Sequence, residues 1–125
     1  MNRRLLPDLF HITEVATWQM AANDGVFDTS SRGTSRAEVG FIHASFAWQI
    51  ERVANLIYAS NDEPLLLLRV DPDRLDVPVR VETMDDYPEP FPHIYGPIPV
   101  EAVVEVLAFE RSEGKYELPF PLDYQ

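Results

Sequence analysis

The residues best suited to acid–base chemistry in this chain are its three histidines, His11, His43 and His93. Histidine has the ordinary pKa nearest to neutrality, so it can give or take a proton under physiological conditions. Each of the three stands near one end of a predicted β-strand, where folds commonly place binding and catalytic residues. A lone histidine is often a partly buried structural residue. Three histidines in such similar settings favour a shared site.

The acidic residue best placed to act with them is Glu82, which ends a predicted strand just before an acidic, proline-rich loop at 83–92. Arg80 shares its face, because successive side chains of a strand alternate between faces. An exposed carboxylate is the commoner interpretation of such a glutamate. The pattern still makes Glu82 and His93 candidate residues of a shared site. The residues predicted to bind the ligand include or flank the histidines: His11, Thr13, His43, Ser45 and Tyr95.

Two other chemistries fit this pattern less well. Three histidines can hold zinc with an open fourth position, but here they lack the short spacing that usually builds such sites. We therefore predict no metal site. A hydrolase could use Ser45 or Ser30 as its nucleophile, but neither lies in a G-x-S-x-G turn, and Ser45 is also a good helix cap. The chain has no cysteine, which excludes disulfides and thiolate catalysis.

The charge of the chain argues against a polyanionic partner. Its net charge is −11, with 10 basic residues scattered among 21 acidic ones. A nucleic-acid binder needs clustered Lys and Arg to release counterions from phosphates. We therefore expect no nucleic-acid partner, although one small basic pocket could hold a nucleotide phosphate.

No segment of the sequence has the length and apolarity of a membrane span, and the longest aliphatic run is Leu65–Leu68. The first residues contain two arginines but lack the apolar stretch of a signal peptide. These features, with the absence of cysteine, lead us to expect a cytoplasmic protein without a membrane partner. The pattern makes no prediction of the oligomeric state.

The elements that must position these residues follow from hydrophobic periodicity over the 125 residues, a length that fits one domain spanning 1–125. Residues 1–7 are expected to be a frayed end. The tail at 110–125 is expected to pack its apolar residues Tyr116, Leu118 and Phe120 on the body. Strands are predicted at 9–13, 39–44, 65–71, 79–82, 93–97 and 102–109, with the strand at 65–71 central.

Two helices separate the first three strands. The first is predicted over 14–23, capped by Thr13, ended by Gly25 and buried through Val15, Trp18 and Ala22. The second is predicted to begin at Ser45 and to end near Ser60. Its buried stripe comprises Phe46, Ile50, Val53, Ala54 and Ile57.

Three aromatic residues outside that stripe, Trp18, Trp48 and Phe41, are expected in the core, and Gln49 could face the His43 end of its strand. The order β-α-β-α followed by several strands favours an α+β fold with a small bent or split sheet. No glycine-rich turn leads from a strand into a helix, so neither a Rossmann fingerprint nor a P-loop is present.

Several strings occur in an order that resembles an uncharacterised bacterial family, domain of unknown function 952. They run from about Leu9 to Phe109 and cover nearly the whole chain. The loop at 28–36 differs, because Ser30-Ser31-Arg32 stands where that family would have a Ser-Leu pair. The strings that carry the resemblance are HIT, GFIHAS, LLLLRVDP, VRVE, FPHIYGPI and AVVEV.

The resemblance implies an ADP-ribosyltransferase-like fold, a split sheet that clamps nicotinamide adenine dinucleotide (NAD). By order along the chain, it implies that His11 holds a ribose and that His43 stacks on nicotinamide. Glu82 and His93 are the catalytic candidates that the resemblance implies. One of the two would bond the ribose and stabilise an oxocarbenium-like transition state, a role that suits a carboxylate better. NAD would be a substrate, and no other cofactor is expected.

Three hypotheses follow. The chain is a small enzyme of ADP-ribosyltransferase type, a non-catalytic module that binds a nucleotide-like ligand, or an accessory domain whose histidines are structural. Convergence of His11, His43 and Glu82 would favour the enzyme. Three widely separated histidines, each bonded to backbone, would favour the accessory domain.

Overall fold

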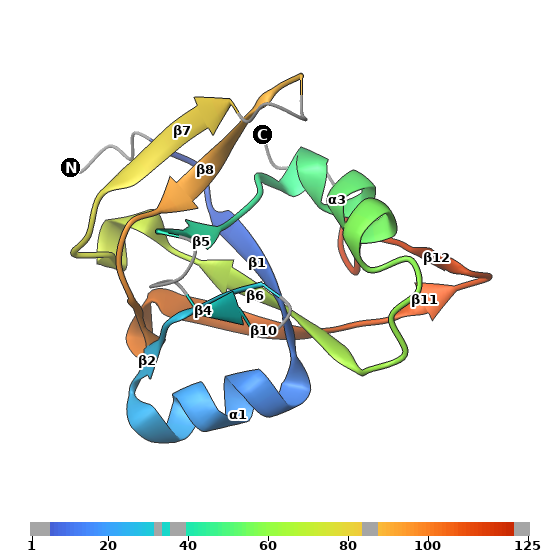
Figure 1. The fold of residues 1–125 in the computed structure, drawn as a ribbon, viewed down its shortest axis with the longest axis horizontal. Coiled ribbons are helices and arrows are strands. Elements are labelled where there is room, and N and C mark those ends of the chain that lie inside the picture. Colours follow the sequence, from blue (N-terminus) through green and yellow to red (C-terminus); the bar gives the residue numbers. More distant parts are fainter. Residues whose placement is uncertain (1–5, 32–33, 36–39, 84–87, 122–125) are drawn as a thin grey trace.

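The computed structural model describes residues 6–31, 34–35, 40–83 and 88–121, which form a mixed α+β fold with two helices and mainly antiparallel strands (Figure 1). The helices are α1 (Val15–Asp24) and α3 (Ile50–Ile57), and short 3₁₀ turns cover Ala47–Gln49, Pro72–Arg74 and Val100–Ala102. The strands are β1 (Leu9–Glu14), β2 (Val26–Phe27), β3 (Thr29–Ser31), β4 (Thr34–Ser35), β5 (Ile42–His43), β6 (Leu65–Val70), β7 (Val79–Thr83), β8 (Pro90–Ile94), β9 (Ile98–Pro99), β10 (Val103–Phe109), β11 (Arg111–Ser112) and β12 (Lys115–Tyr116).

One three-stranded antiparallel sheet has the order β1-β6-β10. Its middle strand, β6, is nearly all aliphatic, and Leu67, Leu68 and Val70 are fully buried. A strand that is apolar on both faces belongs where both faces are covered. The prediction of a central strand here is confirmed. In this sheet His11 lies opposite Leu68.

A second three-stranded antiparallel sheet has the order β5-β8-β7 and carries three of the candidate site residues, His43, Glu82 and His93. His43 on β5 and Arg80 on β7 both lie opposite His93 on β8. The two sheets meet where Phe10 and Ser45 exchange backbone hydrogen bonds, with N···O distances of 2.8 Å in both directions. This contact places the start of β1 beside the chain that leaves β5.

Helix α1 was predicted over nearly the right residues, but its cap was wrong. Thr13 is buried inside β1, and Glu14 stands at the N-cap without a side-chain hydrogen bond. Ala21 is the buried residue of the helix, whereas Ala22 is exposed. Gly25 ends the helix as predicted, with φ of 89° and its N–H donated to the carbonyl of Ala21. Glycine adopts this left-handed conformation without the cost that a Cβ brings.

The second helix begins later than predicted, because Ser45 is not its cap. The backbone of Ser45 is used in the bridge to Phe10, and a 3₁₀ turn precedes α3. The N–H of Phe46 donates instead to Oε1 of Gln49, at 2.9 Å. The helix ends at Ile57, before the predicted end near Ser60. The apolar stripe is confirmed, since its members are all buried or half-buried: Phe46, Ile50, Val53, Ala54 and Ile57.

Three further predictions need correction. The strand predicted at 39–44 spans only Ile42–His43, and Val39 lies outside the described residues. The strand predicted at 93–97 begins earlier, at Pro90, and ends at Ile94. Trp48 is 51% exposed rather than in the core, because it lies on the outer side of the 3₁₀ turn and stacks on Phe46. Trp18 is half-buried against the core.

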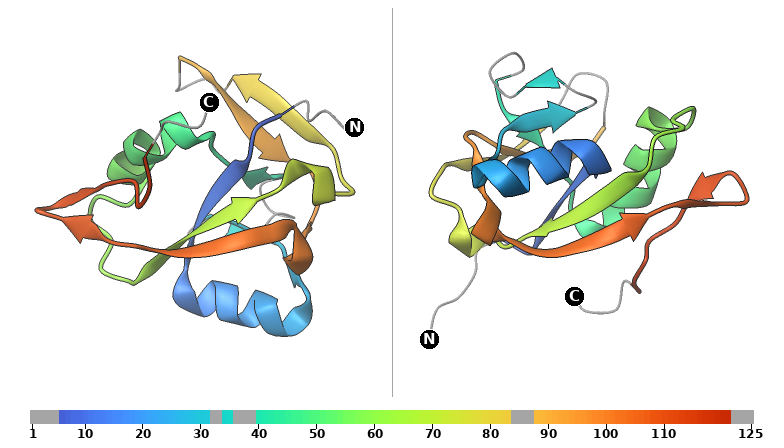
Figure 2. Two further views of the ribbon diagram at one scale, coloured as in Figure 1. Left: turned by 180° about the vertical axis from the view of Figure 1, so that it is seen from behind. Right: turned by 90° about the horizontal axis from the view of Figure 1, so that it is seen from below.

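The core consists of two apolar clusters on opposite faces of β1. Leu9 packs with Phe27, Leu68 and Ile94 in one cluster, and Phe10 packs with Ile50 in the other. Figure 2 shows α1 and α3 well apart, with β1 and β6 passing between them. The described tail adds its own apolar residues to the second cluster: Tyr116, Leu118 and Phe120.

Within the described part of the chain, no helix has both the length and the apolarity needed to cross a membrane.

Candidate functional site

The carboxylate of Glu82 lies at the centre of a hydrogen-bonded cluster on the second sheet. Its Oε1 accepts from the Tyr95 hydroxyl at 2.5 Å and lies 2.8 Å from Nδ1 of His93. Because an ionised carboxylate can only accept, Nδ1 of His93 is the donor. The strand pairing explains the meeting: β7 runs antiparallel beside β8, and alternate residues of each strand share a face.

The electrostatics of the cluster favour a charged Glu82 beside a protonated Tyr95. Donation from the Tyr95 hydroxyl, and secondarily from His93, holds the pKa of Glu82 below its ordinary value. The same hydrogen bond raises the pKa of Tyr95, since losing its proton would place two negative charges together. The side chain of Glu82 is 36% exposed, so its charge is accessible to a ligand.

Aromatic rings form a wall beside this carboxylate. Phe41 stacks on His93 with ring centroids 4.1 Å apart and an interplanar angle of 16°. His43 stands edge-on to both rings, 4.9 Å from Phe41 and 5.3 Å from His93. Burial, and then the neighbouring His93, lowers the pKa of His43. The prediction that Phe41 lies in the core is wrong, because it is half-buried and packs on the site.

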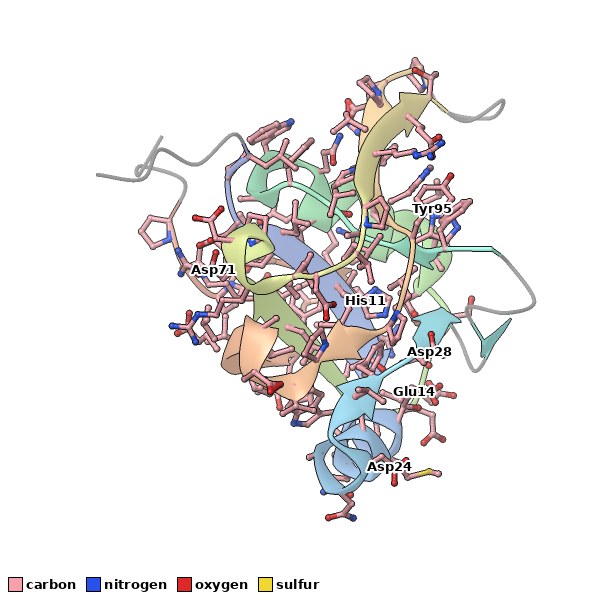
Figure 3. The ribbon with its side chains drawn as sticks, turned by 90° about the vertical axis from the view of Figure 1, so that its left-hand side faces the viewer. His11, Glu14, Asp24, Asp28, Asp71 and Tyr95 are labelled. Atoms are coloured by element: carbon pink, nitrogen blue, oxygen red, sulfur yellow. The ribbon has the colours of Figure 1, made fainter. Side chains whose placement is uncertain are left out.

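His11 lies on β1 and contacts the strand segment that carries His43. Its ring is 3% exposed, packs edge-on against Phe27 with centroids 5.1 Å apart, and lies toward the middle of the molecule in Figure 3. Its Nδ1 lies 2.5 Å from the carbonyl oxygen of His43 and is therefore the donor. Burial lowers its pKa to about 4, so the ring is neutral at physiological pH. Within the described residues its Nε2 is buried without a hydrogen-bond partner.

A cavity of about 180 Å³ adjoins the aromatic wall. His43 belongs to both, since it lines the cavity and contacts His93. Pockets for drug-sized ligands are usually about 300–1,000 Å³, so this cavity suits one small ring or part of a larger ligand. Its lining is mostly apolar and comprises Phe10, His11, Ile12, His43, Ala44, Ser45, Val53, Ile57, Tyr58 and Phe91.

The structure brings most of the predicted site residues together. Glu82, His93 and Tyr95 are hydrogen-bonded, and His43 packs on His93. His11 and Ser45 line the adjoining cavity.

Thr13 stands apart from this group. It is buried in β1 opposite Leu66, and none of its described contacts reaches the cluster.

Two residues of this face were not predicted as site residues. Phe41 stacks on His93, and the guanidinium of Arg80 lies 5.1 Å from the ring centre of Tyr95. The alternation of side chains already placed Phe41 with His43, and Arg80 with Glu82, on shared faces. That alternation was the available signal. Phe41 was instead predicted to lie in the core, because phenylalanine is generally buried.

Comparison with known proteins identifies the family. The model of a family described as protein of unknown function (DUF952) matches residues 12–106, and the chain belongs to this family. No curated protein matches the sequence.

The fold is similar to that of solved structures of one bacterial protein. The X-ray crystal structure of protein CC0527 from Caulobacter crescentus has a TM-score of 0.75 and 25% identity, covering 89% of this chain and 94% of that one. The solution NMR structure of CC0527 has a TM-score of 0.68 and 25% identity, covering 87% and 90% of the two chains. These likenesses support the mixed α+β architecture of this chain.

Proposed function

We propose that this protein binds NAD or a related nucleotide beside Glu82, and that it cleaves the bond between ribose and nicotinamide as an ADP-ribosyltransferase-type enzyme does. In this reaction the C1′–N bond breaks and its electron pair passes to the nicotinamide ring, which becomes neutral. Positive charge develops on the ribose. A nucleophile, either water or an acceptor group, then adds to C1′ and gives up its proton.

The observation that carries the proposal is the state of Glu82. Two donors hold it ionised, and both bond to the same oxygen, Oε1. Among the described residues nothing bonds to Oε2, so this oxygen is available to a ligand. A fixed carboxylate stabilises an oxocarbenium-like transition state more than the ground state, which is the requirement for catalysis. Glycosidases use carboxylates against the same kind of charge.

The geometry also divides the roles of the two predicted catalytic residues. His93 is 2% exposed and donates to Glu82, so we assign it to hold the carboxylate in place. Glu82 is the partly exposed partner, and we assign it to the developing charge. His43, on the aromatic wall and lining the adjoining cavity, is the residue we assign to contact the nicotinamide ring.

The two sheets joined at Phe10 and Ser45 are compatible with the split sheet of an ADP-ribosyltransferase-like fold. The closeness of His43 to His93, and of His93 to Glu82, weighs against an accessory domain with isolated structural histidines. His11 is the exception, because its buried bond to the His43 carbonyl also fits a purely structural link. A module that binds the nucleotide without cleaving it remains the second candidate, and the small cavity favours it.

An NMR titration tests the proposal at the level of binding. Isotope-labelled protein is titrated separately with NAD and with nicotinamide while the imidazole signals are followed. The proposal predicts that the signals of His43 and His93 shift with both ligands, and more weakly in Glu82→Gln. Glu110→Gln is the matched control, because Glu110 is exposed and lies beyond the end of β10. Unchanged imidazole signals at saturating NAD would refute the proposal.

A further inference from the structure

Arg80 differs from the other arginines that the structure describes. Arg52, Arg69, Arg74 and Arg111 each form an ion pair with a carboxylate. Among the described residues, Arg80 forms none, although the chain has twice as many acidic as basic residues. An exposed guanidinium without a direct ion pair can offer its five donors to an anion, and these donors suit phosphate or carboxylate. The carboxylate of Glu82 is near enough to feel the charge of Arg80 but forms no direct ion pair with it.

The position of Arg80 connects it to the Glu82 cluster. Its guanidinium lies 5.1 Å from the ring centre of Tyr95, a cation–π arrangement that restricts where the long side chain can go. The hydroxyl of that tyrosine donates to Glu82. Tyr95 therefore contacts both the Arg80 guanidinium and Oε1 of Glu82. The alternation of side chains along β7 places the two charged groups on one face of the sheet.

The two charges also have a defined spacing. Arg80 and Glu82 are two residues apart on β7, so their backbone positions are about 7 Å apart along the strand. An anion bound near Arg80 is repelled by Glu82 unless the ligand also carries a positive centre toward that carboxylate. The face is thus complementary to a ligand with a negative group at one end and a positive or electron-poor group at the other.

We propose that Arg80 binds the anionic group, a phosphate or a carboxylate, of a ligand whose positive centre faces Glu82. The inference rests on the proposed function in placing a ligand on this face, and it goes further by naming the charge pattern that the ligand must have. Arg80 is a binding residue in this scheme and takes no part in bond cleavage. Its contribution is to select ligands that carry such an anionic group over ligands that lack one, and to fix their direction along β7.

A matched pair of ligands tests this assignment. Nicotinamide mononucleotide carries a pyridinium and a phosphate, whereas nicotinamide riboside carries the pyridinium alone. We expect the wild-type protein to bind the mononucleotide about tenfold more tightly or better, as a charge-assisted hydrogen bond implies. In Arg80→Gln that preference should disappear. Lys115→Gln is the control with the same change of charge, and Lys115 is exposed on the β11–β12 hairpin, far from β7 (Figure 1).

Two further ligands test the anion site independently of the proposed function. They also show whether the site prefers a phosphate or a carboxylate. Ribose 5-phosphate and succinate contain no pyridinium, so their binding depends on the anion site alone. Both should bind more weakly than the mononucleotide, because Glu82 repels an anion that carries no positive centre. If ribose 5-phosphate binds the wild type and Arg80→Gln weakens it further, the anion-binding role of Arg80 holds even when NAD is neither bound nor cleaved. Binding of succinate alone, lost in the same variant, would assign the site to carboxylates. Equal affinity of Arg80→Gln and wild type for every anionic ligand would overturn the inference, as would failure of all of them to bind.

Discussion

The buried, neutral state of His11 makes a prediction about stability at acid pH. Its pKa is about 4 in the folded protein, against an ordinary value of about 6.5 for an exposed histidine. The unfolded chain therefore takes up a proton on this residue at a higher pH than the folded protein does. The contribution of the neutral His11 to the unfolding free energy is therefore fully present above about pH 6.5, and it is lost as the pH falls toward about 4.

The size of the effect follows from the pKa difference. A difference of about 2.5 units, at about 1.4 kcal/mol per unit, corresponds to about 3 kcal/mol of unfolding free energy. Below about pH 4 the residue is protonated in both states and causes no further loss. Because a small domain has only about 5–15 kcal/mol of stability in total, this is a measurable fraction.

The assay is urea unfolding of the wild type and of His11→Asn at several pH values between about 7.5 and 4. Asparagine keeps an N–H donor near the position of Nδ1 but does not titrate. Carboxylates and the other histidines contribute equally to both proteins, so the difference between the two pH profiles isolates His11. The unfolding free energy of the wild type should fall by about 3 kcal/mol more than that of the variant. Parallel profiles across this range would refute the buried, neutral assignment.

Two further perturbations test contacts around the site. Tyr95→Phe removes the main donor to Glu82, so the pKa of Glu82 should rise toward its ordinary value in an NMR titration of the side-chain carboxyl; an unchanged pKa would contradict the hydrogen bond. Gln49→Ala should lower the unfolding free energy by about 1–3 kcal/mol for the buried partners that it leaves unpaired, measured by urea unfolding. The reason is that Gln49 is 1% exposed, accepts from Phe46 N–H, and donates to Glu89 and Pro90. Unchanged stability would show that these bonds contribute nothing net.

Periodicity was enough to find most of the secondary structure, because the strands and helices here are strongly patterned. The run at β6 is aliphatic on both faces, and Gly25 supplies the left-handed residue that ends α1. The errors lie at caps and boundaries, where tertiary contacts decide. Ser45 has the side chain of a helix cap, but its backbone is needed for the bridge to Phe10. No local pattern reveals that requirement.

Part of the candidate site could be predicted from the sequence for the same reason. Alternation along single strands placed Arg80 with Glu82 and His93 with Tyr95, but it could not show that β7 and β8 lie side by side. That pairing joins the two halves of the cluster. The burial of His11 and its bond to the His43 carbonyl also depend on how β1 meets β5. Strand pairing between distant segments is a property of the whole fold, and it decides which candidate residues meet.

The central claim is that Glu82 stabilises positive charge on the ribose of a bound NAD, and nicotinamide release measures this most directly. Purified wild type, Glu82→Gln and the control Glu110→Gln are incubated with NAD, and free nicotinamide is quantified over time. The account predicts release by wild type and control at similar rates, and a loss of about 100-fold or more in Glu82→Gln, the size seen when a transition-state partner is removed. Equal release by Glu82→Gln and wild type, or no release by the wild type, would contradict it.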